Sequence, residues 1–153
     1  MKKIIISFFI IMLSGCSYFQ DKGDETERWT AERLYAEARS ALDSGSYDNA
    51  VELYEKLEAR FPFGTFGQQA ILDLAYAYYK NDDPDAAVST AERFIKLYPQ
   101  NAHVDYAYYL KGLANFQRGK GFAERILPID ESQRDPGSSL QAFQDFSDLV
   151  KRY

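Results

Sequence analysis

A chain of 153 residues with 46% apolar and 27% charged side chains has the composition of one globular domain of ordinary size. Its formal net charge of −5 argues against a nucleic-acid-binding protein, because such proteins carry basic surfaces. One Cys and one His are too few for the common zinc sites, which need several such ligands together.

The first sixteen residues have the pattern of a targeting segment. Lys2 and Lys3 form a short basic region, and an apolar stretch too short to span a bilayer stably follows at residues 4–13. Residues 13–16 (LSGC) then resemble the lipobox of bacterial lipoproteins, in which the cysteine is lipidated and becomes the first mature residue. We therefore expect a lipoprotein signal peptide at residues 1–15 and lipidation at Cys16. The alternative is an ordinary signal peptide with a Cys there by chance.

The residues after the cysteine favour a lipid-anchored protein of the outer membrane. Ser17, rather than an aspartate, follows Cys16, and in Gram-negative lipoproteins this favours transfer to the outer membrane, here on its periplasmic face. Residues 16–28 are polar and charged and are expected to form a tether between the lipid and the fold. No disulfide can form within the mature chain, because its one cysteine carries the lipid.

Residues 29–60 predict a pair of helices. Thr30 can cap the first helix, and Trp29 can pack on Leu34 as a hydrophobic staple. A turn is expected at residues 43–46 (DSGS), and the second helix at about residues 47–60.

Residues 61–98 predict a second pair. Pro62 and the glycines at 64 and 67 argue against a helix through the FPFG turn, so the next helix is expected at about residues 68–80. Asp83 followed by Pro84 is typical of a helix start, and this helix is expected to reach about residue 98. The helix at 68–80 has apolar residues on two faces and therefore needs neighbours on two sides. These residues are Ala70, Ile71, Leu74, Ala75 and Tyr78 on one face and Leu72, Tyr76 and Tyr79 on the other.

The two pairs are copies of one unit, repeated about every 37 residues. Small residues recur in register at Ala50 and Ala87, where short side chains let two helices approach closely, and the same position is reached again at Ala142. The pattern resembles the tetratricopeptide repeat. We expect an all-α superhelix of antiparallel helix hairpins, with about three repeats in a domain at residues 29–153. Their bounds are expected at 29–64, 65–102 and 103–153, the last with a loop of about 18 residues inserted near 119–134.

The last predicted helix, residues 136–153, leaves apolar side chains uncovered. Repeat arrays need a terminal element with a polar outer face. This helix instead carries Phe143, Phe146, Leu149 and Val150. We expect either that the chain is a fragment of a longer protein, the interpretation we favour, or that a partner covers this face.

The combination of lipobox, repeats and insertion resembles the lipoprotein subunits of the machinery that folds β-barrel proteins into the Gram-negative outer membrane. The resemblance covers nearly the whole chain after Ser17 and is carried by residues 61–64 (FPFG), 68–69 (QQ), 73–80 (DLAYAYYK), 105–116 and 130–136. It implies a scaffold that binds unfolded outer-membrane proteins, the β-barrel assembly subunit and accessory lipoproteins. Members of the family have about five repeats, and their C-terminal repeats carry much of the docking to the barrel-forming subunit.

In this repeat class the first helix of each hairpin lines a concave groove. Tyrosine offers a large contact area with little side-chain entropy to lose, so the groove suits an extended peptide. The resemblance implies the C-terminal strand of an unfolded barrel protein, whose carboxylate could meet Arg39, Lys80 or Lys111. The alternative is that the aromatic residues pack between repeats or lie under the inserted loop. The expected peptide-binding residues are Tyr35, Arg39, Leu72, Tyr76, Tyr79, Tyr106, Tyr109 and Phe116.

The sequence contains no pattern that indicates an enzyme. A single His and a lipidated Cys provide no nucleophile–base pair, so we expect no catalytic residue, no cofactor and no metal. The glycines at 64–67 and 119–121 are interpreted as turns rather than phosphate loops, because neither follows a strand. An alternative function is a cell-envelope organiser that binds peptidoglycan or division proteins; co-purification with a large β-barrel protein would argue against it.

Overall fold

The computed structural model describes residues 24–118 and 136–153, and its regular structure in these ranges is entirely helical. The predicted signal peptide, the lipidation site at Cys16, most of the tether and the inserted loop lie outside the described residues. A short 3-10 helix precedes six α-helices. In chain order these elements are η2 (Glu25–Arg28), α2 (Ala31–Asp43), α3 (Tyr47–Arg60), α4 (Thr65–Lys80), α5 (Pro84–Leu97), α6 (Val104–Arg118) and α8 (Pro136–Arg152).

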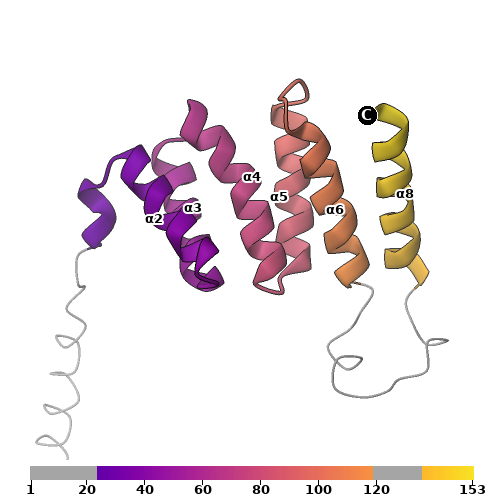
Figure 1. Cartoon of the computed structure of the whole chain (residues 1–153), viewed down its shortest axis with the longest axis horizontal. Helices are drawn as coiled ribbons and strands as arrows, with labels where there is room; N and C mark the ends of the chain where they lie inside the picture. The colour runs from indigo at the N-terminus through magenta and orange to yellow at the C-terminus, as the bar shows by residue number, and fades with distance from the viewer. Residues whose placement is uncertain (1–23, 119–135) are drawn as a thin grey trace, which may run out of the picture.

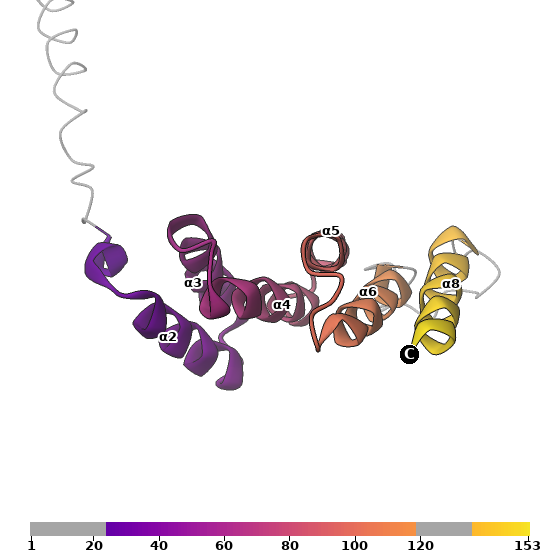
Figure 2. The ribbon, with the colours of Figure 1, turned by 90° about the horizontal axis from the view of Figure 1, so that it is seen from above.

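The helices stand side by side in chain order, each packed against the next (Figure 1). Seen from above, α3 and α5 lie along one side of the row, whereas α2 and α6 lie toward the other (Figure 2). The helix α4 also contacts both α2 and α6, so the first helices of successive hairpins touch one another. The predicted all-α fold of sequential antiparallel hairpins is confirmed.

Local capping chemistry places the helix starts where the sequence predicts them. The Thr30 hydroxyl accepts a hydrogen bond from the backbone N–H of Arg33 and so caps α2. The Asp83 carboxylate accepts one from the N–H of Ala86, and Pro84 is the first residue of α5. Both predicted caps are confirmed.

The start of α4 differs from the prediction: the helix begins at Thr65, three residues before Gln68. Gly64 does end the turn, with φ of 95° in the region that favours glycine. Gly67, however, is helical, and a Cβ there would lie 2.6 Å from the Phe61 carbonyl oxygen and 2.9 Å from Pro62. The second glycine therefore permits a close approach of the α3–α4 connection to α4, and it does not break the helix.

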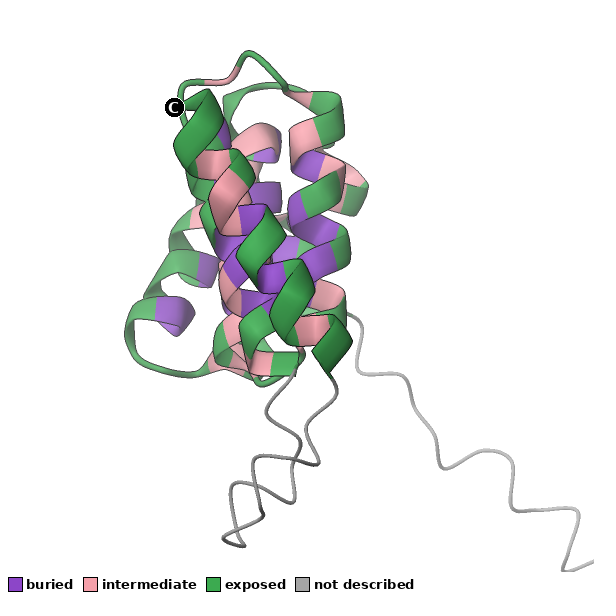
Figure 3. Cartoon of the chain, turned by 90° about the vertical axis from the view of Figure 1, so that its right-hand side faces the viewer, coloured by how far each residue is buried: buried purple, intermediate pink, exposed green. Residues whose placement is uncertain are grey.

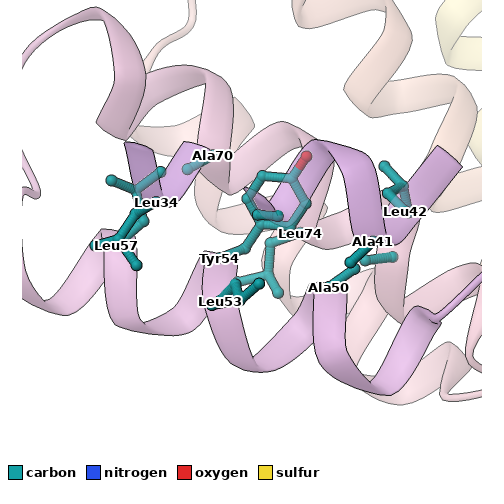
Figure 4. Close-up of a cluster of buried hydrophobic side chains, with 11 residues drawn as sticks. Leu34, Ala41, Leu42, Ala50, Leu53, Tyr54, Leu57, Ala70 and Leu74 are labelled. Atoms are coloured by element: carbon teal, nitrogen blue, oxygen red, sulfur yellow. The ribbon is translucent and has the colours of Figure 1, made fainter. Parts of the chain in front are cut away.

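The core consists of apolar side chains between successive helices. One cluster joins α2, α3 and α4, and in it the fully buried Tyr54 lies among aliphatic side chains (Figure 4). The small repeat positions Ala50, Ala87 and Ala142 are all buried, as the repeat register predicts. Figure 3, which looks at the molecule from the α8 end, shows buried segments between the helices and exposed ones on the outside.

The outer face of α8 is apolar and uncovered in part. Phe143 and Val150 are 70% and 80% exposed, whereas Phe146 is half-buried and its ring lies 6.1 Å from that of Tyr109. The expectation of an uncovered face is therefore confirmed for Phe143 and Val150 but not for Phe146 and Leu149, which are both half-buried. None of the helices in residues 24–118 and 136–153 has the length and apolar character that a membrane crossing requires.

Replacing Gly67 with alanine tests the close approach at the start of α4. A Gly→Ala change inside a helix usually stabilises a protein by about 0.5–1 kcal/mol. Here the new Cβ would meet backbone atoms that cannot rotate away, so we expect a loss of about 1–3 kcal/mol in the free energy of unfolding. Urea denaturation followed by circular dichroism measures it. The exposed Ser40→Ala in α2 is the control, and a Gly67→Ala variant as stable as the wild type would contradict the packing.

Candidate functional site

A cavity of about 570 Å³ lies on the side of the row formed by α2, α4 and α6. It contains four of the predicted peptide-binding residues, from all three helices. Arg39 comes from α2, Leu72 and Tyr76 come from α4, and Tyr106 comes from α6. The other lining residues are Leu42, Asp43, Tyr47, Gln69, Asp73 and His103.

A row of aromatic rings extends from this cavity toward α8. The ring centroids of Tyr76 and Tyr79 are 6.5 Å apart on α4, and those of Tyr106 and Tyr109 are 6.2 Å apart on α6. Tyr106 and Tyr109 remain 37% and 42% exposed. These distances are in the range of favourable aromatic pairs. Tyr79 also packs against the buried cluster of Ala87, Val88 and Ala114, so the exposed aromatic surface beside the cavity is that of Tyr106 and Tyr109.

Two further predicted residues, Tyr35 and Phe116, lie outside the cavity lining, and a third, Leu72, lines it but is mainly a core residue. Tyr35 packs between the rings of Tyr54 and Phe66, with centroids 6.1 and 5.5 Å away, and is not part of the cavity lining. Leu72 is 2% exposed and belongs mainly to the core between α4 and α6. Phe116, at the end of α6, is 47% exposed but does not line the cavity. For Tyr35 and Leu72 the alternative interpretation, packing between repeats, describes most of their contacts.

The most unusual group at the cavity is Asp73, a carboxylate that is only 6% exposed. Its Oδ2 accepts hydrogen bonds from the hydroxyls of Tyr35 at 2.9 Å and Tyr54 at 3.4 Å. Its Oδ1 accepts one from the side-chain amide of Gln69 at 3.0 Å, one turn earlier in α4. The guanidinium of Arg39 lies 3.9 Å from Oδ2. One buried acid thus connects α2, α3 and α4.

Burial determines the acid–base behaviour of this cluster. Desolvation raises the pKa of Asp73 above its ordinary value of 3.8, although the hydrogen bonds from Tyr35 and Gln69 and the charge of Arg39 oppose the shift. Desolvation and the nearby Asp73 carboxylate raise the pKa of Tyr35 to about 12, and the same causes raise the pKa of Tyr54 further. Both tyrosines therefore stay protonated and act as donors to Asp73 at neutral pH.

Asp73 is not among the site residues predicted from the sequence. A signal for it was present, because it lies between Leu72 and Leu74 in the most apolar of the described helices, and a buried acid requires partners. Asp43 and His103, which also line the cavity, lie at the end of α2 and just before α6. Neither has a local pattern that distinguishes it from other exposed polar residues.

The three cations expected to meet a carboxylate are used differently. Arg39 lines the cavity, is half-exposed, and donates from Nε to the Asp43 carboxylate at 3.2 Å. The Lys80 ammonium lies 5.5 Å from the ring centre of Tyr47, another residue of the lining. Lys111 instead forms ion pairs with Glu92 of α5 at 2.9 Å and Asp145 of α8 at 3.2 Å. The suggestion of a carboxylate-binding role for Lys111 is therefore not supported.

The residues that the structure describes contain no group of three or more His, Cys, Asp or Glu side chains arranged to hold a metal ion. The donors around the cavity are mainly tyrosine hydroxyls, one guanidinium and two amide or imidazole side chains. This set is suited to hydrogen bonding with a peptide backbone and polar side chains.

Comparison with known protein families agrees with the fold. A family model described as tetratricopeptide repeat matches residues 22–153, and the chain belongs to this family of helical-hairpin repeat proteins. The match supports the expectation of a non-enzymatic scaffold.

The chain is also similar to named members of one group of outer-membrane assembly factors. It is 43% identical to "Outer membrane protein assembly factor BamD" of Neisseria gonorrhoeae in an alignment 158 residues long. This alignment covers 100% of this chain and 59% of the relative. The protein of the same name from Vibrio cholerae is 39% identical over 93% of the chain and 58% of its own length. That of Xylella fastidiosa is 33% identical over 98% of the chain and 50% of its own length. The resemblance found in the sequence is confirmed, and the chain spans half to three fifths of these relatives.

The raised pKa of Asp73 predicts an unusual dependence of stability on pH. A folded-state pKa above the unfolded value means that the folded state binds the proton more tightly. The stabilising contribution of protonated Asp73 is therefore complete below the unfolded pKa and is lost as the pH rises through the folded pKa. We expect the stability of the wild type relative to Asp73→Asn to fall as the pH rises from the ordinary pKa of 3.8 through the higher pKa of the folded state.

Urea denaturation of both proteins at several pH values measures this difference. Because the other titrating groups are common to both proteins, their contributions cancel. A relative stability that increased with pH would show that the hydrogen bonds to the ionised carboxylate outweigh its desolvation.

Proposed function

We propose that this chain is a lipid-anchored scaffold of the outer-membrane β-barrel assembly machinery. In this role it binds segments of unfolded outer-membrane proteins in the cavity between α2, α4 and α6, and it also binds other assembly subunits. The observation that carries the proposal is the aromatic surface of Tyr76, Tyr106 and Tyr109, which continues from the cavity across two repeats. The similarity to assembly factors called BamD supports it.

The chemistry of this surface suits an extended peptide. Exposed tyrosine rings provide apolar contact area, and their hydroxyls can pair with the N–H and C=O groups that an unfolded strand leaves unsatisfied. Arg39 at the cavity wall can contribute a charge-assisted hydrogen bond to a carboxylate of the peptide. Binding of this kind needs no cofactor, because burial of the peptide supplies the free energy.

The anchoring part of the proposal rests on the lipobox at residues 13–16. Two or more acyl chains on Cys16 would hold the protein stably on a membrane, whereas a single chain would be marginal. Residues 16–28 would then act as the tether, with the repeat domain from residue 29 on the periplasmic side of the outer membrane.

Titration of a labelled peptide tests the binding function. The probe is a fluorescein-labelled peptide of about ten residues from the C-terminal strand of an outer-membrane β-barrel protein, the length of one barrel strand. A scrambled peptide is the control, and the full chain in lipid nanodiscs is the receptor. Saturable binding of the native peptide alone supports the proposal, whereas equal binding of both peptides contradicts it.

The same titration with Tyr106→Ala locates the site. Removal of an exposed aromatic anchor should weaken binding by about 1–3 kcal/mol, or about 5- to 150-fold, with little change in helical content. Phe143→Ala, an exposed aromatic of α8 outside the cavity, is the matched control and should bind normally. If both variants bind like the wild type, the peptide does not bind at this cavity.

A cysteine substitution tests the anchor separately. We expect Cys16→Ser to abolish acylation and to move the protein from the outer-membrane fraction to the soluble fraction of Gram-negative cells. Fractionation and mass spectrometry of the N-terminus measure both effects, and Ser17→Ala serves as the control. A Cys16→Ser protein that stayed in the membrane fraction would show that something other than the lipid retains it.

A further inference from the structure

The structure contains two buried carboxylates that resemble each other in their local partners. Asp73 of α4 is 6% exposed and accepts a hydrogen bond from Gln69, four residues earlier. Asp145 of α8 is 4% exposed and accepts one from Gln141, also four residues earlier. Each also accepts hydrogen bonds from elements that precede it in the chain, so each connects a helix to its neighbours.

The two carboxylates differ in what surrounds them. Asp145 faces Asn115, whose amide donates at 2.6 Å, and Lys111, which lies 3.2 Å away; both come from α6. Neither residue lines the cavity between α2, α4 and α6. Asp73 lines that cavity, and its Oδ2 faces Tyr35 and Arg39 of α2. Of the two carboxylates, only Asp73 is therefore placed to influence the proposed peptide site.

The contacts of Asp73 determine how α2 presents its side chains there. The Tyr35 hydroxyl, which lies outside the cavity lining, donates its proton to Asp73 and so ties α2 to α4 beside the cavity. The Arg39 guanidinium has an acid on each of two helices. Asp73 of α4 lies 3.9 Å from it, and Asp43, one turn later in α2, lies 3.2 Å from it. Without the charge of Asp73, Arg39 would lose its one cross-helix ion pair among the described residues and would keep its exposed pair with Asp43, one turn away on the same helix, and its contact with Tyr35.

Asp73 is also a residue whose ionised form is disfavoured in the fold, because burial raises its pKa. A buried carboxylate between two leucines is not what packing alone would select. Perturbed acids of this kind gather at functional sites, where stability is given up for a required geometry.

We infer that Asp73 is a positioning residue of the peptide site: its carboxylate fixes Tyr35 and Arg39 of α2 against α4 and thereby sets the affinity of the cavity for an extended peptide. The inference rests on the function proposed above and assigns it a residue that acts through its neighbours.

The test compares Asp73→Asn with Asp145→Asn in the peptide titration, with the full chain in nanodiscs and the same labelled strand peptide. Both changes keep the size of a buried side chain and remove one charge. We expect Asp73→Asn to weaken binding about tenfold and Asp145→Asn to leave the Kd within about twofold. Tyr35→Phe, which keeps the ring and removes the donor, is expected to weaken binding about threefold and serves if Asp73→Asn fails to fold.

Peptide titrations at several pH values provide a second test. A purely structural role of Asp73 would leave the ratio of the wild-type to the Asp73→Asn affinity independent of pH. The ratio of the wild-type to the Asp73→Asn affinity should shrink as the pH falls through the pKa of Asp73, because the wild type then also has a neutral side chain there. Other titratable or charged groups face Asp73 or share its cavity and are common to both proteins, so the ratio isolates Asp73. They are Tyr35, Arg39 and Asp43 of α2, Tyr47 and Tyr54 of α3, Tyr76 of α4, and His103 and Tyr106 at α6.

The outcomes separate the two proposals. One outcome is that the wild type prefers the native peptide while Asp73→Asn and Tyr35→Phe bind that peptide with the wild-type affinity. In that case the positioning role is wrong and the binding function stands. Equal weakening by Asp145→Asn would likewise overturn the positioning role, because it would trace the effect to general loosening of the fold. If the wild type does not distinguish the native from the scrambled peptide, the binding function fails, and the inference fails with it.

Discussion

The fold depends on the close approach of neighbouring helices at small side chains. Ala50, Ala87 and Ala142 are buried at equivalent positions of successive repeats. At Gly112 a Cβ would lie only 2.7 Å from the ring of Phe146, and at Gly67 it would meet the backbone before α4. Because each helix packs mainly on its sequence neighbours, these contacts stack the hairpins into a row and leave the first helix of each hairpin facing a shared surface.

Polar contacts add specificity to this apolar packing. Asp73 and Asp145 are buried acids that are satisfied by donors from other helices, and burying a carboxylate without such partners would be costly. Their partners are different: tyrosines and a glutamine for Asp73, and an asparagine, a lysine and a glutamine for Asp145. A hairpin placed in the wrong order would leave one of these carboxylates without its donors, so the pairs favour one arrangement of similar units.

The cavity between α2, α4 and α6 combines these two features. Stacking places Tyr76 and Tyr106 on a common surface, and Arg39 lines its wall with a guanidinium nitrogen 3.9 Å from Asp73 Oδ2. A surface of this composition can bind an extended chain through ring contacts and hydrogen bonds without selecting one sequence strictly. That property suits the proposed role in outer-membrane protein assembly, where one receptor would have to accept the strands of many different barrels.

The sequence alone was enough to predict the helical hairpins, their caps at Thr30 and Asp83 and the repeat class, because periodicity and capping are local properties of the chain. It also identified Tyr76 and Tyr106 as groove residues through the repeat register. Only the tertiary structure decided that Tyr35 packs inward onto Asp73 and that Lys111 pairs with Glu92 and Asp145. The Tyr35–Asp73 bond joins residues 38 positions apart, and the pair of Lys111 with Asp145 spans the inserted segment. Such contacts depend on how hairpins stack, and no local pattern encodes that stacking.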